Sequence, residues 1–486
     1  MIPLPFPGET GTVQAVYLTR RRGDAEEEAE KTAENIQTWE RGVSGDSGLR
    51  GEAYARVEDC SGEASVEEGG ASGETWAGAT RVSRELAPIL ECIRSRSTGR
   101  SETCARSAVD GADSCKTGEG MRVVIDATPL LVRSAGVKNY LYYWILHMRR
   151  MAGAAVIGTF PRMDRVRALT HQASVAGPLR TWSGLGALAL SNHLGVPLLN
   201  WLARGADVFH SSVLVRHPPS RVRLTATVYD LTAALMPELH SRGNLIAEES
   251  FSKLARRADR LIAISECTRQ DAVRVLGIKP ERISTIYPGV ADAFFDPPAA
   301  LVEAVRERYG LRRPFVLFVG TIEPRKNVDL LLDAYESLPQ SLRDHWELVV
   351  AGPVGWAGDA TVARLRYVRY LGYIPEPDLA PLTAAADVFV YPSLYEGFGF
   401  PVAQAMAAGV AVITSNVSSL PEVAGSAALL VDPRSQCELR AALVRLLGSA
   451  NLRKALGLAG RDRARGFRWE VCAAKSLEFF QDVVGE

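Results

Sequence analysis

The sequence predicts an α/β protein with parallel strands, divided into more than one domain. Residues 315–319 and 387–390 are short runs of β-branched and aromatic residues, each followed by a glycine-containing turn and a helical pattern. A third run of this kind begins at Met121 and leads to an apolar helix from Gly136 to about Arg149. The length of 486 residues allows two or three domains.

Composition and charge disfavour several classes of function. The chain has 56 Lys and Arg against 56 Asp and Glu, so there is no global basic field to attract nucleic acid. It lacks an uninterrupted apolar stretch of about 18 residues, which a membrane-spanning helix needs. Its first residues lack the pattern of a signal peptide, and the cytoplasm is the default location. Seven cysteines without a C-x-x-C pair argue against a zinc site or a disulfide framework, and we expect no metal.

Residues 1–120 differ from the rest of the chain. They are rich in Gly, Ser, Glu, Arg and Thr, and few apolar positions repeat at any period. Such a segment cannot bury enough apolar surface to offset the entropy lost on ordering, so we expect a disordered low-complexity extension. Because a domain that starts with a strand follows at Met121, we hypothesise that Met121 is the natural start. The upstream segment would then be a start-site overextension or a dispensable tail.

Two glycines and a proline follow the strand at residues 387–390. Pro401 suits the first turn of a helix, because its φ is already helical and its missing N–H would have no partner there. With Gly397 and Gly399 before it, free amides can point outward beside the positive end of the helix dipole. We expect this turn to hold a phosphate or diphosphate, although glycines at such turns are common in any α/β protein. The amides in question are those of Phe398, Gly399 and Phe400.

Glu396 and Gln404 flank this turn, one before the helix and one in its opening turns. Both side chains can hold hydroxyl groups on either side of a bound diphosphate. A nucleotide sugar presents that arrangement of groups.

Two adjacent cations, Arg325 and Lys326, precede the helix expected at residues 328–337. Cations at a helix N-terminus oppose the macrodipole, so an anion should compensate them. That anion can be a bound diphosphate. The alternative is a solvated basic pair held by Glu323 or Asp329, since surface ion pairs are frequent and weak.

Residues 320–327, Gly-Thr-Ile-Glu-Pro-Arg-Lys-Asn, and the later Glu-Gly-Phe-Gly-Phe-Pro segment resemble the donor half of the family 4 glycosyltransferases, which are retaining enzymes of the GT-B fold. The resemblance covers nearly everything after residue 120. It implies two Rossmann-like domains facing across a cleft, with Arg325 and Lys326 on the donor diphosphate and Glu396 near the donor sugar. The family has a second glutamate where this chain has Gln404, which keeps an acceptor oxygen for the ribose.

The resemblance also implies the division into domains. We expect an acceptor-side domain at 121–300, a nucleotide-sugar-binding domain at 301–468, and a helix at 469–486 that crosses back to the first domain. Ser265 is the expected N-cap of a helix in the first domain. The apolar face expected for the last helix repeats at helical spacing and consists of Val471, Ala474, Leu477, Phe480 and Val484.

Three residues after predicted strands of the first domain are further site candidates, because ligands gather at the C-terminal ends of parallel strands. His210 is an acceptor-side candidate, with a satisfied buried histidine as the alternative. Tyr229 and Asp230 stand where the family often has His-Asp beside the donor sugar, and a tyrosine with a pKa near ~10 is a poor base. Gly136 resembles the glycine loop of the family, which approaches the donor phosphate. The alternative is that Gly136 is only a glycine at the start of a helix.

Residues 368–375 resemble the loop on which the family seats the nucleotide base. Tyr373 and Ile374 would pack against the face of the base. As residues of a core strand they would need no such explanation. Basic and apolar residues at 180–201 can contact a membrane that displays a lipid-linked acceptor, and a pair of core helices is the alternative.

These features predict a hexosyltransferase of polysaccharide synthesis that moves a sugar, with mannose favoured, from GDP-mannose or a UDP-hexose to a glycan or lipid-linked acceptor. The chain has no Asp-x-Asp motif to hold a divalent cation, so the leaving-group charge must be met by cations and amides. One alternative, motivated by Gln404 and Tyr229, is a nucleotide-sugar-binding protein that has lost catalysis. Another is an epimerase or phosphorylase of the same fold.

Overall fold

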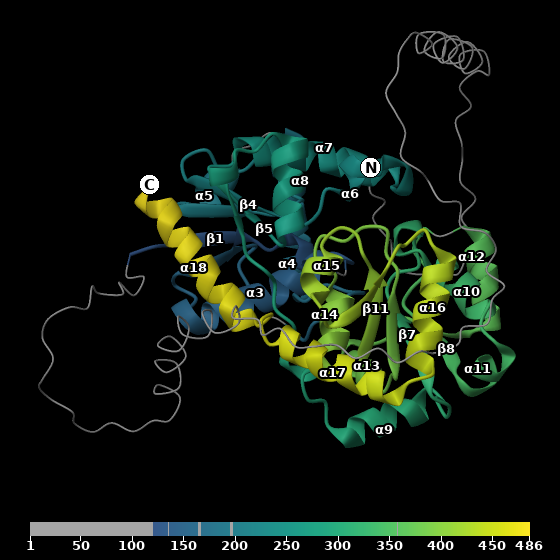
Figure 1. Cartoon of the computed structure of the whole chain (residues 1–486). Coiled ribbons are helices and arrows are strands. Elements are labelled where there is room, and N and C mark those ends of the chain that lie inside the picture. Colours follow the sequence, from purple (N-terminus) through teal and green to yellow (C-terminus); the bar gives the residue numbers. More distant parts are fainter. Residues whose placement is uncertain (1–119, 135, 164–166, 195–197, 357) are drawn as a thin grey trace, which may run out of the picture. The chain divides into compact units, whose positions relative to one another are not determined.

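The computed structural model describes residues 120–486, except 135, 164–166, 195–197 and 357 (Figure 1). Two parallel six-stranded sheets organise this part of the chain, with strand orders β2-β1-β3-β4-β5-β6 and β12-β11-β10-β7-β8-β9. Helices connect the successive strands of both sheets except β3 and β4, which a loop joins, and this is the doubly wound, Rossmann-like arrangement. The predicted fold class is confirmed. The extension expected at 1–120 lies outside the described residues, apart from Gly120.

The first sheet is formed by short strands that pair in parallel throughout. Its strands are β1 (Val123–Asp126), β2 (Ile157–Phe160), β3 (Val208–Ser211), β4 (Arg223–Val228), β5 (Arg260–Ala263) and β6 (Ile283–Thr285). The helices of this half are α3 (Gly136–Ala152), α4 (Pro178–Leu194), α5 (Leu198–Leu202), α6 (Thr232–Leu235), α7 (Arg242–Arg257) and α8 (Glu266–Leu276). The predicted cap of α8 is confirmed, because the Ser265 side chain accepts a hydrogen bond from the Thr268 amide.

The second sheet is also parallel throughout. Its strands are β7 (Phe315–Val319), β8 (Glu347–Ala351), β9 (Arg369–Gly372), β10 (Val388–Tyr391), β11 (Ala411–Ser415) and β12 (Ala428–Val431). The helices from residue 299 onward are α9 (Ala299–Arg308), α10 (Val328–Glu336), α11 (Gln340–His345), α12 (Asp359–Arg364), α13 (Glu376–Ala384), α14 (Phe400–Ala407), α15 (Leu420–Ala424), α16 (Gln436–Leu447), α17 (Ala450–Ala464) and α18 (Trp469–Gly485).

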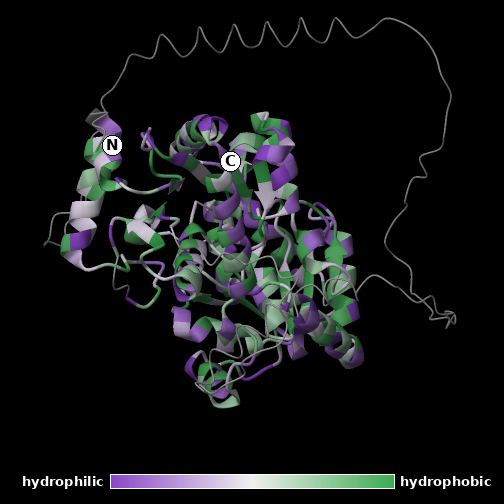
Figure 2. Cartoon of the chain, turned by 90° about the vertical axis from the view of Figure 1, so that its left-hand side faces the viewer, coloured by the Kyte–Doolittle hydropathy of each residue, from purple (hydrophilic) through white to green (hydrophobic). Residues whose placement is uncertain are grey.

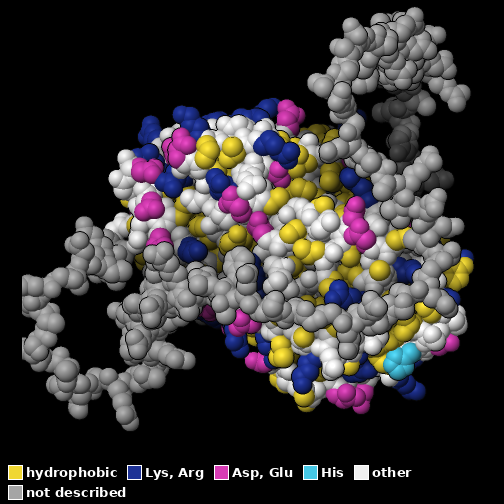
Figure 3. Space-filling model, in the orientation of Figure 1, with side chains coloured by type: hydrophobic (Ala, Val, Ile, Leu, Met, Phe, Trp, Pro, Cys, Tyr) yellow, Lys and Arg dark blue, Asp and Glu magenta, His cyan; other side chains and the backbone are white. Residues whose placement is uncertain are grey.

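In the second sheet, β7 and β10 consist of apolar and aromatic residues because both faces of the sheet are covered. In the first sheet, the central β3 and β4 also bury polar side chains, namely His210, Thr225 and Thr227. In β1, Val123 and Ile125 belong to one buried cluster and Val124 to another, as the alternation of side chains along a strand requires. The outer helices carry hydrophilic and hydrophobic residues in alternation along their length (Figure 2). On the face shown in Figure 3, positive and negative side chains are interspersed, which fits the balanced composition.

The C-terminal helix α18 packs along α3 of the first half (Figure 1). The Trp144 indole N–H donates to Ser476 Oγ at 2.8 Å, and Trp469 contacts the rings of Tyr140 and Tyr143. Of the apolar face predicted for α18, Phe480 is buried and Leu477 packs against the buried cluster, whereas Val484 is exposed. Small residues form part of the buried face, and the prediction did not include them. The buried positions are Trp469, Cys472, Ala473, Ser476, Phe479, Phe480 and Val483.

The strands of the first sheet lie between residues 123 and 285, and those of the second between 315 and 431. We therefore propose a domain division near residue 300, with α18 returning to the N-terminal domain as a separate element. We call the part before this division the N-terminal domain, and the part from there to the start of α18 the C-terminal domain.

Candidate active site

The predicted anion-binding turn lies between β10 and α14. Pro401 occupies the first turn of α14, as predicted, and Gly399 before it has a φ of +92°. A Cβ at Gly399 would also lie 2.6 Å from Leu420 Cδ2, so only glycine fits there. Within the described residues, the backbone amides of Phe398 and Phe400 donate to no acceptor, nor does that of Gly399. These N–H groups stand at the positive end of the α14 dipole.

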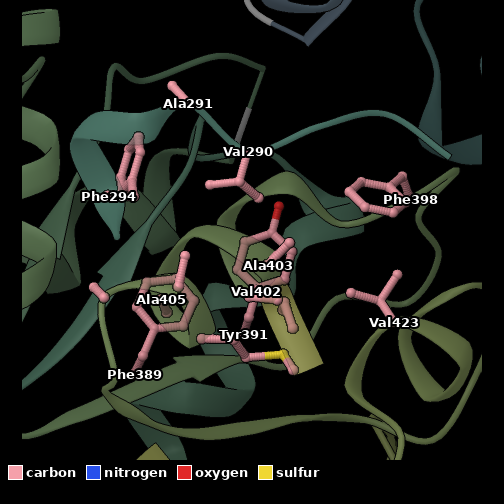
Figure 4. Close-up of a cluster of buried hydrophobic side chains, with 14 of the residues drawn as sticks. Val290, Ala291, Phe294, Phe389, Tyr391, Phe398, Val402, Ala403, Ala405 and Val423 are labelled. Atoms are coloured by element: carbon pink, nitrogen blue, oxygen red, sulfur yellow. The ribbon is translucent and has the colours of Figure 1, made fainter. Parts of the chain in front are cut away.

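The side chain of Phe398 has a different role from its amide. It is buried in the apolar cluster around α14, where Figure 4 draws it with Val402, Ala403 and Val423. Its ring also contacts the rings of Phe400 and Phe467. This packing holds the backbone of the turn in place while its amides remain free.

Gly397 brings this turn against the N-terminal domain. A Cβ at Gly397 would lie 1.9 Å from the carbonyl oxygen of Tyr229, which follows β4. The Thr268 hydroxyl of α8 donates to the Gly397 carbonyl at 3.1 Å. The glycine is thus required by a close backbone contact, and the predicted anion-binding turn lies where the two domains meet.

The basic pair predicted to bind diphosphate points inward beside the same turn. Arg325 and Lys326 belong to a 3-10 turn, η5 (Pro324–Lys326), and their side chains are 13% and 11% exposed. Lys326 Nζ lies 2.5 Å from Glu396 Oε1, and Arg325 Nη1 lies 3.1 Å from the same oxygen. Arg325 Nη2 donates to Glu323 at 2.8 Å, and the Ser393 hydroxyl donates to Glu396 at 2.6 Å. Protein carboxylates therefore compensate both cations.

The charges of this cluster set one another's ionisation. Burial alone would raise the pKa of Glu396, but Arg325 and Lys326 outweigh it and lower this pKa to about 2. Burial and the Arg325 charge lower the pKa of Lys326, against the effect of Glu396. Burial also acts to lower the pKa of Arg325, which the charges of Glu396, Asp230 and Glu323 nonetheless raise above its usual value. Asp230 thus acts on the basic pair from the N-terminal domain.

Asp230 and Tyr229 follow β4 but differ in what they offer. Asp230 Oδ1 accepts hydrogen bonds from the Thr232 amide and hydroxyl at 3.0 and 2.6 Å. The Tyr229 ring packs edge-on against Tyr140 of α3, with 5.3 Å between centroids. Burial raises the pKa of Tyr229, and the nearby Asp126 adds to the effect, so the hydroxyl remains protonated at neutral pH. It can donate a hydrogen bond, but it cannot act as a base.

His210 is a buried structural histidine in β3. Its two ring nitrogens lie 2.9 Å from the hydroxyls of Thr225 and Thr227 in the adjacent β4. The ring also contacts Trp144 at 4.9 Å between centroids, and burial lowers its pKa to about 3. Both nitrogens are therefore engaged inside the N-terminal domain, as in the structural alternative. The structure does not join His210 to the group of Glu396, Arg325 and Lys326.

Gly136, Gln404, Tyr373 and Ile374 differ in how far they are buried. Gly136 begins α3, and a Cβ there would meet no described atom within 4 Å, so open space adjoins it. Gln404 is half-buried in α14, and its side chain makes no hydrogen bond with the described residues. Tyr373 is half-buried and Ile374 is buried, both directly after the edge strand β9.

Sequence reasoning missed two residues that the structure brings to this region. Glu422 of the C-terminal domain accepts hydrogen bonds from the amides of Glu266 and Cys267, at 2.9 and 3.0 Å, and so caps α8 of the N-terminal domain. His240 follows the 3-10 turn η2 (Pro237–Leu239), and its pKa responds to the charges of Asp230 and Arg325. His240 follows no predicted strand. A histidine between two helical segments was the one available signal.

A hollow on the described surface lies away from this group of residues. It measures about 650 Å³ and is lined by residues including Arg221, Arg223, Arg257 and Asp259. Arg223 begins β4, so this hollow adjoins the N-terminal ends of the strands, whereas Tyr229 and Asp230 follow their C-terminal ends. Within the described residues, no three His, Cys, Asp or Glu side chains come together as metal ligands. Among the described helices, none combines the length and apolar character needed to cross a bilayer.

Both halves of the chain match glycosyltransferase families. Residues 134–294 match "Glycosyltransferase Family 4" and residues 303–463 match "Glycosyl transferases group 1". The O-antigen chain mannosyltransferase B of Escherichia coli is 34% identical over 267 residues, covering 53% of this chain and 70% of that protein. The chain belongs to glycosyltransferase family 4. These matches confirm the family resemblance that the sequence motifs of this glycosyltransferase indicated.

One more related sequence and one solved structure resemble this chain. A serotype-specific mannosyltransferase WbdA of Escherichia coli is 30% identical over 264 residues, and this glycosyltransferase spans 32% of its length. The crystal structure of HepE from Anabaena in complex with UDP-glucose is 18% identical, with a TM-score of 0.57 over 74% of this chain and all of that one. That likeness supports the GT-B fold alone.

Proposed function

We propose that the protein transfers a hexose, with mannose as the first candidate, from a nucleoside-diphosphate sugar to a glycan or lipid-linked acceptor in polysaccharide synthesis. The observation that carries this proposal is the buried cluster of Arg325, Lys326 and Glu396 beside the free amides of the α14 turn. The family membership and the two mannosyltransferase relatives support the choice of reaction and sugar.

In this proposal, the diphosphate of the donor lies on the amides of Phe398, Gly399 and Phe400. Lys326 has three N–H donors, of which Glu396 takes one, and the guanidinium of Arg325 has five. Donors that remain can reach the oxygen that becomes negative when the bond to the sugar breaks. Because the groups are already held in place by their carboxylate partners, little reorganisation is needed at that moment. Removing one such preorganised donor typically costs on the order of 10²- to 10³-fold in turnover.

The sugar would lie between Glu396 of the C-terminal domain and Asp230 of the N-terminal domain. The two residues are close together, because a Cβ at Gly397, which follows Glu396, would lie 3.0 Å from the Cβ of Asp230. Their oxygens accept hydrogen bonds from sugar hydroxyls. Retention of the anomeric configuration is a proposal from the family resemblance. Tyr229 would donate a hydrogen bond to the sugar, because its hydroxyl stays protonated.

The nucleoside would extend from the phosphates along the C-terminal domain. Gln404 is placed one helical turn inside α14, where its free amide can bond the ribose hydroxyls. Tyr373 and Ile374 would pack against the base. The open space at Gly136 leaves room for the backbone of α3 to approach the donor phosphate from the N-terminal domain.

We propose that the acceptor is presented at a membrane surface and that α4 and α5 contact it. Leu179, Trp182 and Trp201 are 83%, 56% and 69% exposed, which does not fit a pair of core helices. Trp side chains with nearby Arg residues such as Arg180 suit a lipid interface. Flotation of the full chain with anionic vesicles tests this. The Trp182→Ser and Trp201→Ser variants should float less than Tyr367→Ser, which removes an equally exposed aromatic from the C-terminal domain.

The experiment that tests the transfer itself uses the purified full chain with radiolabelled GDP-mannose or UDP-glucose, with and without a short mannoside acceptor. We expect a labelled glycan with one donor, and about 10²-fold less with Lys326→Ala. Lys454→Ala, a matched change on an exposed helix of the same domain, should match the wild type. Unchanged turnover in Lys326→Ala would refute the phosphate role of this lysine.

A second candidate is a nucleotide-sugar-binding protein that has lost catalysis. The packed, protonated Tyr229 favours it, because this side chain cannot accept a proton. Donor binding without transfer or hydrolysis would support this candidate. An epimerase of the same fold would instead convert the nucleotide sugar without releasing the nucleotide, which product analysis distinguishes.

A further inference from the structure

His240 occupies a loop of the N-terminal domain that the C-terminal domain holds in place. The Trp356 indole N–H donates to the carbonyl of Leu239 at 3.0 Å. The His240 ring faces Trp356, with 6.3 Å between centroids and an angle of 43°. On the other side, the Ser241 side chain caps α7, which directly follows. The backbone on both sides of His240 is therefore held in place, and its ring lies against Trp356.

Both ring nitrogens of His240 are covered, yet neither has a hydrogen-bond partner among the described residues. Buried polar atoms are usually paired, because an unpaired one lowers stability. His210 shows the ordinary case in the same domain, with a threonine hydroxyl at each nitrogen. The ring nitrogens of His240 can therefore form hydrogen bonds with a ligand that supplies the partner the protein does not.

The segment that contacts His240 adjoins the proposed donor site. Trp356 directly follows Gly355, whose amide donates to the Ile322 carbonyl at 3.0 Å, just before η5. The charged groups that act on the pKa of His240 are Asp230 from the loop after β4, Glu238 from η2, and Glu323 and Arg325 from the turn at η5. Asp230 and Arg325 belong to the proposed donor site. Burial is the largest effect on the pKa of His240 and lowers it, so the ring is neutral at neutral pH. A neutral imidazole has one donor and one acceptor nitrogen, as a sugar hydroxyl requires.

We propose that His240 is a specificity-determining residue that hydrogen-bonds a hydroxyl of the transferred sugar, on the side of Asp230 and Arg325. This inference rests on the proposed function and adds a contact that the sequence did not indicate. It assigns His240 to the donor sugar because Trp356, which His240 faces, follows a segment bonded to Ile322, and Ile322 leads into the turn that carries Arg325 of the proposed donor site. Trp356 of the C-terminal domain holds the loop that carries His240. The hydrogen bond from His240 to the sugar would therefore form only when the two domains meet.

The test replaces His240 with leucine, of similar size, and with glutamine, which keeps hydrogen-bonding atoms. For a working donor, His240→Leu should lower kcat/KM on the order of 10- to 100-fold, and His240→Gln should recover part of it. In the absence of donor, His240→Leu should unfold at the same or a higher temperature, because an unpaired polar group is removed. A merely structural histidine would give a lower unfolding temperature. This readout separates the two roles.

Monodeoxy analogues of the donor sugar then identify the contact. The wild type should discriminate against one analogue, and His240→Leu should treat that analogue and the full sugar alike. Equal kinetics of wild type and His240→Leu with every analogue would overturn the proposal while leaving the glycosyltransferase function intact. If the wild type neither binds nor transfers from GDP-mannose or UDP-glucose, the proposed function fails and the role of His240 fails with it.

Discussion

Replacing Lys326 with methionine separates the contribution of the buried cluster to stability from its contribution to catalysis. The pKa of Glu396 lies at about 2 instead of 4.5, and the difference corresponds to a net stabilisation of about 3 kcal/mol from the two cations and the Ser393 hydrogen bond, after the opposing effect of burial. Lys326 is nearer to the shared oxygen than Arg325, at 2.5 against 3.1 Å. We therefore expect Lys326→Met to lower the free energy of unfolding by ~2 kcal/mol or more at pH 7.

The pH dependence of this loss has a definite sign. The pKa of Glu396 is depressed in the folded protein, so the stabilisation is fully present above about pH 4.5 and is lost as the pH falls toward 2. The wild type and Lys326→Met should therefore differ most at neutral pH and converge in acid. Urea unfolding followed by tryptophan fluorescence at several pH values measures this difference. The exposed Lys454→Met variant is the matched control.

The variants Glu396→Gln and Lys326→Met/Glu396→Gln complete a double-mutant cycle with Lys326→Met and the wild type. Because the double variant removes both charges of the pair, its stability should return to within about 1 kcal/mol of the wild type, as other buried ion pairs replaced by uncharged groups do. Its transfer activity should remain at least ~10²-fold reduced, since the donor to the leaving phosphate is absent. Equal stability of Lys326→Met and the wild type, or an active double variant, would refute the reasoning.

Three further outcomes follow from the contacts between the domains and from the α14 helix. Gly397→Ala places a Cβ 1.9 Å from the Tyr229 carbonyl, so the domains must separate there, and we expect turnover to fall at least tenfold with a smaller loss of unfolding temperature. Glu422→Gln removes the charge that caps α8 and should cost ~1 kcal/mol in urea unfolding, whereas Glu478→Gln on an exposed face should not. Gln404→Glu should change the KM for the donor severalfold with kcat nearly unchanged, because a ribose contact acts before and during transfer alike.

The elements that sequence reasoning predicted correctly are those specified by local patterns. A continuous apolar run followed by a glycine turn identified β7 and β10, and Pro401 and Ser265 identified the starts of α14 and α8. Each of these signals lies within a few residues of the feature it specifies. The family resemblance supplied the two-domain arrangement.

The parts that were missed depend on residues far apart in the chain. Glu396 and Lys326 are 70 residues apart, and Glu422 and the α8 amides about 155, so no local pattern could pair them. The face of α18 was predicted only in part, at Leu477 and Phe480, for a related reason. Large apolar residues mark a helix face in sequence, but contact with α3 uses small residues such as Ala473 and Ser476, whose value depends on the neighbouring helix.

The arrangement of charges also bears on how a donor would bind. Arg325 and Lys326 are matched by Glu323 and Glu396, so the four groups together carry no net charge. Asp230 nearby adds a negative charge, which a diphosphate must approach as well. Long-range attraction therefore contributes little, and donor affinity must come from short-range bonds to the α14 amides and to the N–H groups that the carboxylates leave free. Affinity built in this way depends only weakly on ionic strength, unlike binding to a surface that is basic overall.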